Sequence, residues 1–564
     1  MSLINLTKKL KIIDKLIITL FLVLVFSLII IRRWLPVNTL IAYFDDGLFV
    51  SRAEFILNGN LGKLNSGFNA LVKGTVYPWF IVISKIAGLS PIFLSYLFLI
   101  LNVTLLSFFI YKLTNRIYLS FILSFFIIAD PVYFTDSASR IMREQVQQNF
   151  ILLFFVLFNL LIYLISKKEL GTKKIIVFFA LLGGIFVVAL NVREENIWIY
   201  SALIINILLI FPIKIDHKKR FLIFLTLFIS IFISIHAVRL VNNIFYGVSL
   251  QNNTTEGEFP KMMLNLSSIQ TDSGNIRYVS IDKNKRELAY KASPTFSKLE
   301  SNLEGPGQAW IQFGCNDSQT CDDYANGWFH VALREAMKEQ GWWDSESIAQ
   351  NQMKKVNQEI EGACERNLIT CKKGIPFGPA YGNQFISQQE VIDANTYFFQ
   401  YTNQSFNSWS ISRNLEKDTI LKTEVMPEDM YQSWRKTIPS MPPAQITYIN
   451  KFNSRYLEFQ PFLNIWTFVY SNLLKLFFVI NILILFYAIG NKILRKKFLH
   501  FWPLYLSFFY IWISKGALLS LNSSINFKSV GLTYALSSRA FLTGFLAIGI
   551  IIFSLIITEK KVND

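Results

Sequence analysis

The sequence predicts an α-helical polytopic membrane protein with about ten transmembrane helices and a mainly helical extracytoplasmic domain. Of its 564 residues, 52% are hydrophobic and only 16% are charged, against about 25% charged in soluble proteins. Its apolar residues come in blocks long enough to cross ~30 Å of hydrocarbon as helices. One long segment between two groups of these blocks has the composition of a soluble domain.

Ten apolar blocks are interpreted as spans. They cover residues 16–33, 91–111, 117–130, 149–166, 175–190, 197–213, 221–239, 465–489, 499–515 and 537–557. The first is too long for a signal-peptide core and no small-residue cleavage pattern follows it, so it is predicted to be retained. The chain thus divides into an N-terminal transmembrane module (1–240) with an outer loop (34–90), an extracytoplasmic domain (241–464) and a C-terminal transmembrane module (465–564).

Basic residues predict the orientation of these spans. Lysines and arginines gather at residues 8–15, 167–174, 214–220 and 492–497, which ten spans place on one side. The positive-inside rule makes that side cytoplasmic, with Arg32 and Arg33 as exceptions. The net charge of +17 is therefore explained by topology and by anionic headgroups of the bilayer, and no nucleic-acid partner is expected.

All four cysteines lie in the predicted extracytoplasmic domain, at Cys315, Cys321, Cys364 and Cys371. An even count in an exported segment predicts disulfides, and of the three connectivities the local one is favoured because each bond closes a short loop. Four free thiols are the alternative. Together with the richness in Asn, Lys and Ile, the cysteines predict a multi-pass protein of a bacterial inner (cytoplasmic) membrane, with its large domain facing the periplasm.

The first outer loop carries two adjacent carboxylates, Asp45 and Asp46, just beyond the first span. A short surface helix ending at Gly59 is expected to follow them. Residues 77–88 are apolar but too few to cross the bilayer, which predicts an interfacial helix.

Three further outer segments carry charge. Residues 136–148 are predicted to form a helix that continues into the fourth span, with Arg140, Arg143, Glu144 and Gln147 on one face. The short turn at 191–196 contains Arg193, Glu194 and Glu195, and Lys73 precedes the interfacial helix. Such charged groups at a membrane surface can line a water-filled or ligand-binding pocket. The alternative is that they have no site: the acidic pair belongs to a solvated loop, residues 191–196 form an ordinary capped turn, and the arginines and lysine extend to the lipid headgroups. Arg539, at the start of the last span, is a weaker candidate.

The order of a span, an acidic pair, surface helices, a Pro-led amphipathic helix and a second span resembles the GT-C superfamily of polyprenyl-phosphate-sugar-dependent integral membrane glycosyltransferases, over residues 1–200. The resemblance implies that Asp45 or Asp46 is the catalytic base of an inverting transfer. Lys73, Arg140, Arg143 and Arg193 would then hold the donor phosphate, and Glu144, Glu194 and Glu195 would complete the pocket. The expected partners are a polyprenyl-phosphate-linked sugar in the bilayer and an extracytoplasmic glycan or lipid acceptor, for instance of lipopolysaccharide.

Two matters stay open in this interpretation. Some members of the superfamily place Mg²⁺ or Mn²⁺ between such carboxylates and the phosphate, and others need no metal, so no cofactor is certain. The alternative functions are an O-antigen polymerase or ligase, and a non-catalytic polysaccharide transporter or assembly protein. Transporters tend to show matched halves, whereas seven predicted spans precede the large domain and three follow it.

Overall fold

The computed structural model describes residues 12–35, 45–59, 71–135, 137–194, 197–272, 276–376, 378, 381–406, 444–491, 498–526 and 538–563. These residues form helices and two isolated β-bridges, with no extended strand among them. The predicted helical class is therefore confirmed.

Eight helices in the described part of the chain are long and apolar enough to cross a membrane. They are α2 (Ile12–Trp34), α5 (Pro91–Thr114), α7 (Glu144–Ser166), α8 (Thr172–Val192), α10 (His217–Tyr246), α21 (Ala444–Gly490), α23 (Trp502–Asn526) and α25 (Arg539–Asn563). The chain is thus a multi-pass helical membrane protein. The other two predicted spans, α6 (Ile117–Ile128) and α9 (Ile197–Ile210), have 12 and 14 residues, fewer than the ~20 that span hydrocarbon, so the count of ten stays a prediction.

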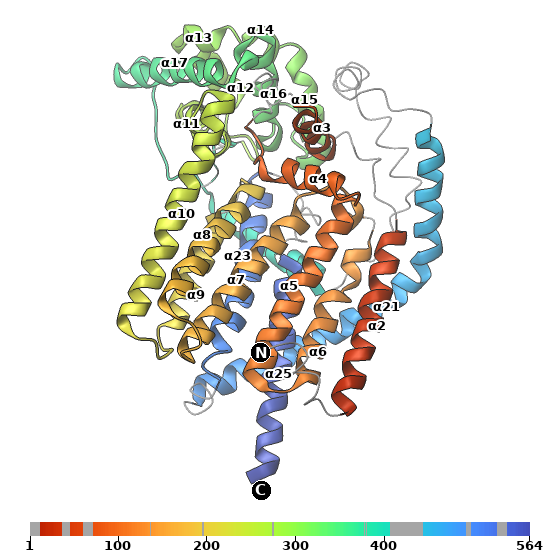
Figure 1. Ribbon diagram of the computed structural model, residues 1–564. Coiled ribbons are helices and arrows are strands. Elements are labelled where there is room, and N and C mark those ends of the chain that lie inside the picture. Colours follow the sequence, from red (N-terminus) through yellow and green to blue (C-terminus); the bar gives the residue numbers. More distant parts are fainter. Residues whose placement is uncertain are drawn as a thin grey trace.

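The membrane-length helices pack side by side as one bundle (Figure 1). In the most apolar 18-residue stretch of α7 and of α25, 67% of the residues are buried, against 6% in α2 and 17% in α10. Helices α7 and α25 therefore lie inside the bundle, and α2 and α10 lie at its edge. Polar side chains join the inner helices. Asn102 on α5 donates to the Asn149 carbonyl on α7 (2.8 Å), and Asn206 on α9 donates to the Ser507 hydroxyl on α23 (2.7 Å).

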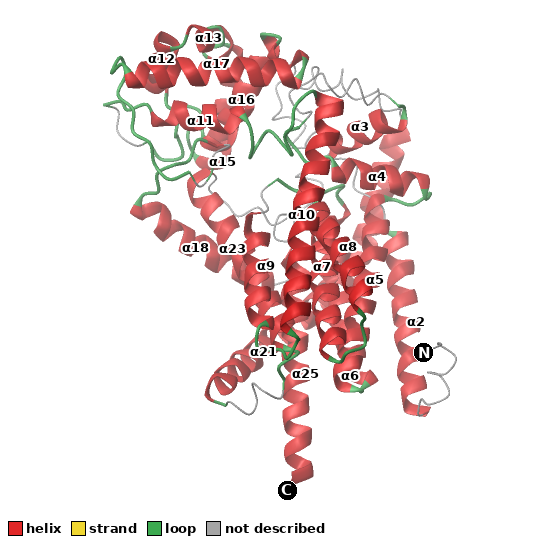
Figure 2. Ribbon diagram, turned by 60° about the vertical axis from the view of Figure 1, so that its left-hand side comes forward, coloured by secondary structure: helices red, strands yellow, loops and turns green. Residues whose placement is uncertain are grey.

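A second hydrophobic core forms at one end of the bundle, opposite the C-terminal end of α25 (Figures 1 and 2). We call residues 247–371 the cap. Its helices are α11 (Glu258–Ser268), α12 (Lys283–Ala292), α13 (Pro294–Ser297), α14 (Glu300–Leu303), α15 (Ala309–Ser318), α16 (Asn326–Glu339) and α17 (Glu346–Glu365). The chain enters the cap at Gly247, whose φ of 72° ends α10. Disulfides join Cys315 to Cys321 and Cys364 to Cys371, which confirms the predicted local pairing.

The chain returns to the bundle through α18 (Gln388–Phe406), which lies beside α23 (Figure 2). Tyr401 donates to the Trp512 carbonyl (3.2 Å) and shares a hydrogen bond with the Ser538 hydroxyl (2.7 Å). Gly516 makes this approach possible, because a Cβ there would overlap the Tyr401 ring. Although α18 has the composition of a soluble helix, it packs on the apolar bundle through the aromatic ring of Tyr401.

The described parts of the segment between α2 and α5 contain two short helices, at the level where the cap meets the bundle (Figure 1). Two short helices were predicted here, but the first begins at Asp45 itself and does not follow the acidic pair. They are α3 (Asp45–Leu57) and α4 (Val76–Ile86). One face of α4 is buried through Tyr77, Phe80 and Ile81, while Trp79 and Ile83 are exposed. The helix thus packs one face in the protein and leaves a mostly apolar face exposed, so its interfacial position stays a prediction.

The prediction of a helix that runs from residue 136 into the fourth span is wrong. The chain instead forms 3₁₀ turns η2 (Pro131–Phe134) and η3 (Ser137–Ser139), and α7 begins only at Glu144. The cause is competition for the backbone: the Ala138 carbonyl accepts from Gln145 Nε2 (2.9 Å) and from Arg32 (3.5 Å), and Arg32 also donates to the Ser139 hydroxyl (3.3 Å). These bonds replace the i to i+4 bonds of a helix.

Candidate active site

The predicted acidic pair stands at the first turn of α3, where the backbone of Asp45 and Asp46 begins the helix. Their side chains, and the whole of Glu195, lie outside the described residues. Phe49, one helical turn after Asp45, is fully buried, and its ring centre lies 5.0 Å from the Arg143 guanidinium. The helix that carries the aspartates therefore packs directly on a predicted phosphate ligand.

Arg143 and Glu194 form a bidentate ion pair between the start of α7 and the turn after α8. Arg143 Nη1 donates to Glu194 Oε2, and Nη2 donates to Oε1 at 3.1 Å. Arg143 Nη1 also reaches the Val192 carbonyl (3.4 Å). Burial acts to raise the pKa of Glu194, but Arg143 and Lys73 outweigh it and hold that pKa well below its usual range, so Glu194 is ionised.

Lys73 completes this group, with its Nζ 3.6 Å from Glu194 Oε1 and 22% of its side chain exposed. Arg143, Glu194 and Lys73 are called the rim cluster below. Lys73 is the more accessible of its two cations, since only 2% of the Arg143 side chain is exposed. The rim cluster thus offers a partly exposed ammonium whose position is set by a buried ion pair.

The backbone that carries Lys73 is held from three sides, and we call residues 71–75 the strap. The Leu71 carbonyl accepts from the Asn253 amide of the cap (2.9 Å), and the Val72 carbonyl accepts from the Thr254 hydroxyl (2.7 Å). Arg52 of α3 donates to the Lys73 carbonyl (3.2 Å).

Close packing holds the next position of the strap. A Cβ at Gly74 would overlap the carbonyl oxygen of Asn191, so the strap lies against the end of α8. The Lys-Gly pair of the sequence is therefore explained by a cation placed where the backbone passes too close to α8 for any side chain.

The other predicted ligands are less accessible. Arg193 Nη1 bonds Glu144 Oε1 at 2.7 Å, with exposures of 5% and 1%, so the two residues pair with each other across α8 and α7. A phosphate role for Arg193 would require breaking a buried ion pair, which is costly. Arg140 is half-buried in the segment before α7 and does not share a helical face with Arg143.

Arg539 lies deep in the bundle, in contact with Asp130, an acid that no pattern in the sequence singled out. Arg539 Nε lies 2.5 Å from Asp130 Oδ2, and Nη2 lies 3.3 Å from Oδ1. Arg539 also donates to the Ser405 carbonyl, and both members of the pair are at most 4% exposed. We call Asp130 and Arg539 the bundle pair. It joins η2, α18 and α25, and we expect it to stabilise their packing.

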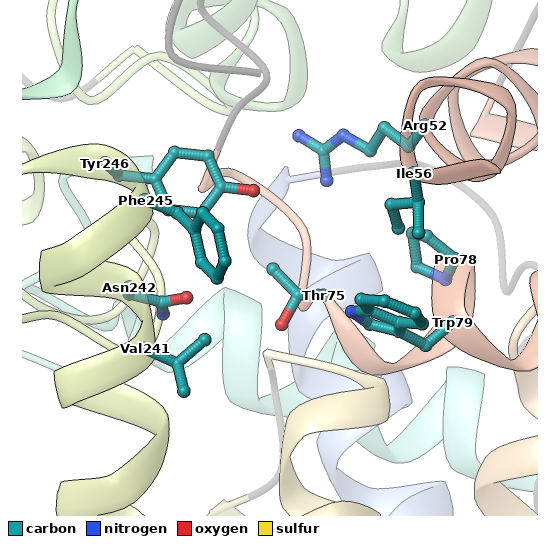
Figure 3. Close-up of a pocket in the computed structure, with 9 residues that line it drawn as sticks. All are labelled: Arg52, Ile56, Thr75, Pro78, Trp79, Val241, Asn242, Phe245 and Tyr246. Atoms are coloured by element: carbon teal, nitrogen blue, oxygen red, sulfur yellow. The ribbon is translucent and has the colours of Figure 1, made fainter. Parts of the chain in front are cut away.

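A small pocket of about 70 Å³ lies next to the strap (Figure 3). Its lining comes from α3, the strap, α4 and the end of α10: Arg52, Ile56, Thr75, Pro78, Trp79, Val241, Asn242, Phe245 and Tyr246. The Arg52 guanidinium and the Tyr246 hydroxyl point toward each other from opposite walls (Figure 3). Below them the walls are mostly apolar, and Trp79 and Val241 are 46% and 48% exposed. The pocket therefore combines a polar upper end with an apolar surface on the outside of the bundle.

The described residues contain no group of three or more metal-ligating side chains. Both oxygens of Glu194 face cations, which makes this part of the site suited to an anion and unsuited to a divalent metal. The carboxylates of Asp45, Asp46 and Glu195 are not among the described side chains, so metal binding by them stays a prediction.

Sequence reasoning missed three buried charged residues near the site: Arg52, Arg334 and Glu346. Arg334 and Glu346 lie on amphipathic helices of the cap, where a charged residue is expected on the solvent-exposed face. The sequence does not reveal their burial, because the segments that cover them are distant in the chain. No family model, curated protein or solved structure matches this chain.

Proposed function

We propose that the protein is an inverting glycosyltransferase, which moves a sugar from a polyprenyl-phosphate carrier to an acceptor outside the cytoplasm. In this proposal the cap faces the periplasm of a bacterial cell, and the acceptor is a cell-surface glycan or lipopolysaccharide. The observation that carries it is the contact of Arg143 with both Glu194 and Phe49. This contact brings the charged turn after α8 to the helix that begins with Asp45 and Asp46.

The proposed reaction uses one of these aspartates as a general base. As the acceptor oxygen forms its bond to the anomeric carbon, its proton passes to the carboxylate. The bond from that carbon to the phosphate oxygen breaks on the opposite face, and its electron pair leaves with the polyprenyl phosphate. A positioned base of this kind contributes roughly 10² to 10⁴ in rate.

The leaving phosphate gains negative charge, and Lys73 is the cation placed to stabilise it. The strap fixes its backbone, and Glu194 holds its ammonium beside Arg143. Stabilisation by such a fixed charge is worth more than in water because the site does not have to reorganise. The pocket next to Thr75 supplies an apolar surface for the carrier chain.

The test is mass spectrometry of surface glycans from a deletion strain complemented with wild type, Asp45→Asn, Asp46→Asn or the control Asp344→Asn, an exposed position in the cap. Equal amounts of protein in the membrane are confirmed first. The expected result is one sugar unit lost on deletion and restored by wild type and the control, but not by one of the two variants. Full restoration by both variants would end the carboxylate mechanism and favour a transporter or an assembly factor.

A further inference from the structure

Helix α18 belongs to the segment that the sequence assigns to the extracytoplasmic domain, yet its C-terminal end lies among the membrane-length helices (Figure 2). The centre of the Phe406 ring lies 4.9 Å from that of Phe478 on α21 and 5.9 Å from that of Trp512 on α23. The carbonyl of the preceding Ser405 accepts a hydrogen bond from Arg539, the first residue of α25. The last turn of α18 therefore lies at the depth of three predicted spans.

The two sides of α18 differ in exposure. Tyr397 and Tyr401 are buried, and their spacing of four residues places them on one stripe, which packs beside α23. On the other side Phe399 is 73% exposed, while Val391 and Ile392 are 50% and 51% exposed. Phe399 follows Ile392 by seven residues, which is two helical turns, so the two side chains share a face. The helix thus leaves large apolar side chains uncovered along one face.

The exposed residues of α18 include no charged side chain. Besides the three apolar residues they are glutamine, asparagine or threonine. The two acids of the helix are held by neighbouring groups. Glu390 accepts hydrogen bonds from the Ser387 amide (2.6 Å) and hydroxyl (2.9 Å), and Asp393 pairs with Arg277. The exposed face of α18 is therefore uncharged as well as partly apolar.

Helices of the cap differ from α18 in this respect. Helix α17 exposes Lys354 and Lys355, and α12 exposes Lys283 and Glu287. Such charges are typical of the water-facing side of a helix in a soluble domain. An exposed apolar patch rimmed by polar residues instead marks a contact with a membrane or with another protein. The position of the last turn of α18 among the spans favours the membrane.

We propose that the exposed face of α18 lies in the lipid leaflet on the cap side of the membrane and contacts acyl chains there. Phe399 lies about 10 Å along the helix from the inserted Phe406, and Ile392 lies about 10 Å further, nearer the headgroups. The apolar surface of the bundle thus continues onto α18. Because α18 contains no lysine or arginine, the contact does not require anionic lipid. The proposal does not depend on glycosyl transfer.

The test is the fluorescence of an NBD label on single introduced cysteines, in the full chain in phosphatidylcholine nanodiscs with or without acyl-brominated lipid. The introduced cysteine is labelled alone, because the four native cysteines are bonded in disulfides. The test variants are Phe399→Cys and Ile392→Cys. Phe468→Cys, at a 71% exposed position in the span of α21, is the lipid-facing control, and Lys354→Cys on α17 is the water-facing control.

We expect brominated lipid to quench the label of Phe399→Cys as it does that of Phe468→Cys. The label of Ile392→Cys should be quenched less, and that of Lys354→Cys should not be quenched. Adding phosphatidylglycerol should leave the quenching unchanged, and quenching that appears only with this lipid overturns the charge-independent contact. If Phe399→Cys is as weakly quenched as Lys354→Cys, the proposal is wrong. Quenching by aqueous iodide then shows a face open to water, and protection from iodide shows a face covered by protein.

Discussion

The rim cluster and the bundle pair are both contacts between an arginine and a carboxylate, yet they differ in what surrounds them. In the bundle pair, Asp130 and Arg539 are closed off by the helices that they join. In the rim cluster, Arg143 and Glu194 are equally buried, but Lys73 beside them is partly exposed and lies next to a pocket. A buried ion pair is therefore evidence of structure, and an accessible third charge is what makes such a pair a candidate site.

The largest effect is expected in the bundle pair. Arg539→Met leaves Asp130 buried without its partner, which should cost about 3–5 kcal/mol of stability. The measurement is the denaturant midpoint and the yield of folded protein from membranes.

Arg277→Met breaks an exposed pair and should cost less than about 1 kcal/mol. The double variant Asp130→Leu with Arg539→Met should recover much of the loss. If Arg539→Met were as stable as wild type, the bundle pair would have no structural role and the comparison with the rim cluster would fail.

In the rim cluster we expect a large effect on activity and a small one on folding. Lys73→Met removes the accessible cation and should lower transfer roughly 10²- to 10³-fold, by analogy with the loss of one charge-stabilising donor. The melting temperature should change little, because the Lys73 side chain is partly exposed. The assay is glycan restoration, with Lys85→Met on the exposed side of α4 as control. Equal restoration by both variants would remove Lys73 from the mechanism.

A smaller effect is expected from Gly74→Ala, which keeps every charge of the rim cluster. Because a Cβ there would overlap the Asn191 carbonyl, the strap must shift, at a cost of about 1–3 kcal/mol. Transfer should fall with it, since Lys73 moves away from Glu194. Gly59→Ala is the control for a loop glycine with open space around it, although its φ of 68° adds some strain. An active and equally stable Gly74→Ala would show that the strap does not position Lys73.

A further effect concerns pH. The pKa of Glu194 is lower in the folded protein than its usual 4.5, so its ion pairs stabilise the fold above that value. The stabilisation is lost as the pH falls below 4.5 toward the lowered pKa. The difference in melting temperature between wild type and Glu194→Gln should therefore be greatest at neutral pH and shrink in acid. A difference that stays constant with pH would mean that Glu194 is not stabilised as an anion.

One group of contacts could be predicted from the sequence. Charged residues in short outer segments indicated that Arg143, Glu194 and Lys73 belong together, and the structure places them in contact. The helical register of residues 136–143 could not be predicted, because Arg32, more than a hundred residues earlier, takes the carbonyl and hydroxyl groups of η3. The pairing of Arg193 with Glu144 was also not foreseen, since it depends on how α7 and α8 lie against each other.

By itself the sequence determined the membrane-length helices, the short apolar helix α4 and the two local disulfides. Each depends on neighbours in the chain: hydrophobic length sets a span, and a loop of a few residues brings two cysteines together. Tertiary structure alone decided which charges are accessible. Asp130 meets Arg539 across 409 residues, and the burial of Arg334 depends on Phe259 and Trp343 from other segments. The physical reason is that exposure and pairing of a charge are set by whatever packs around it, and local sequence does not contain that information.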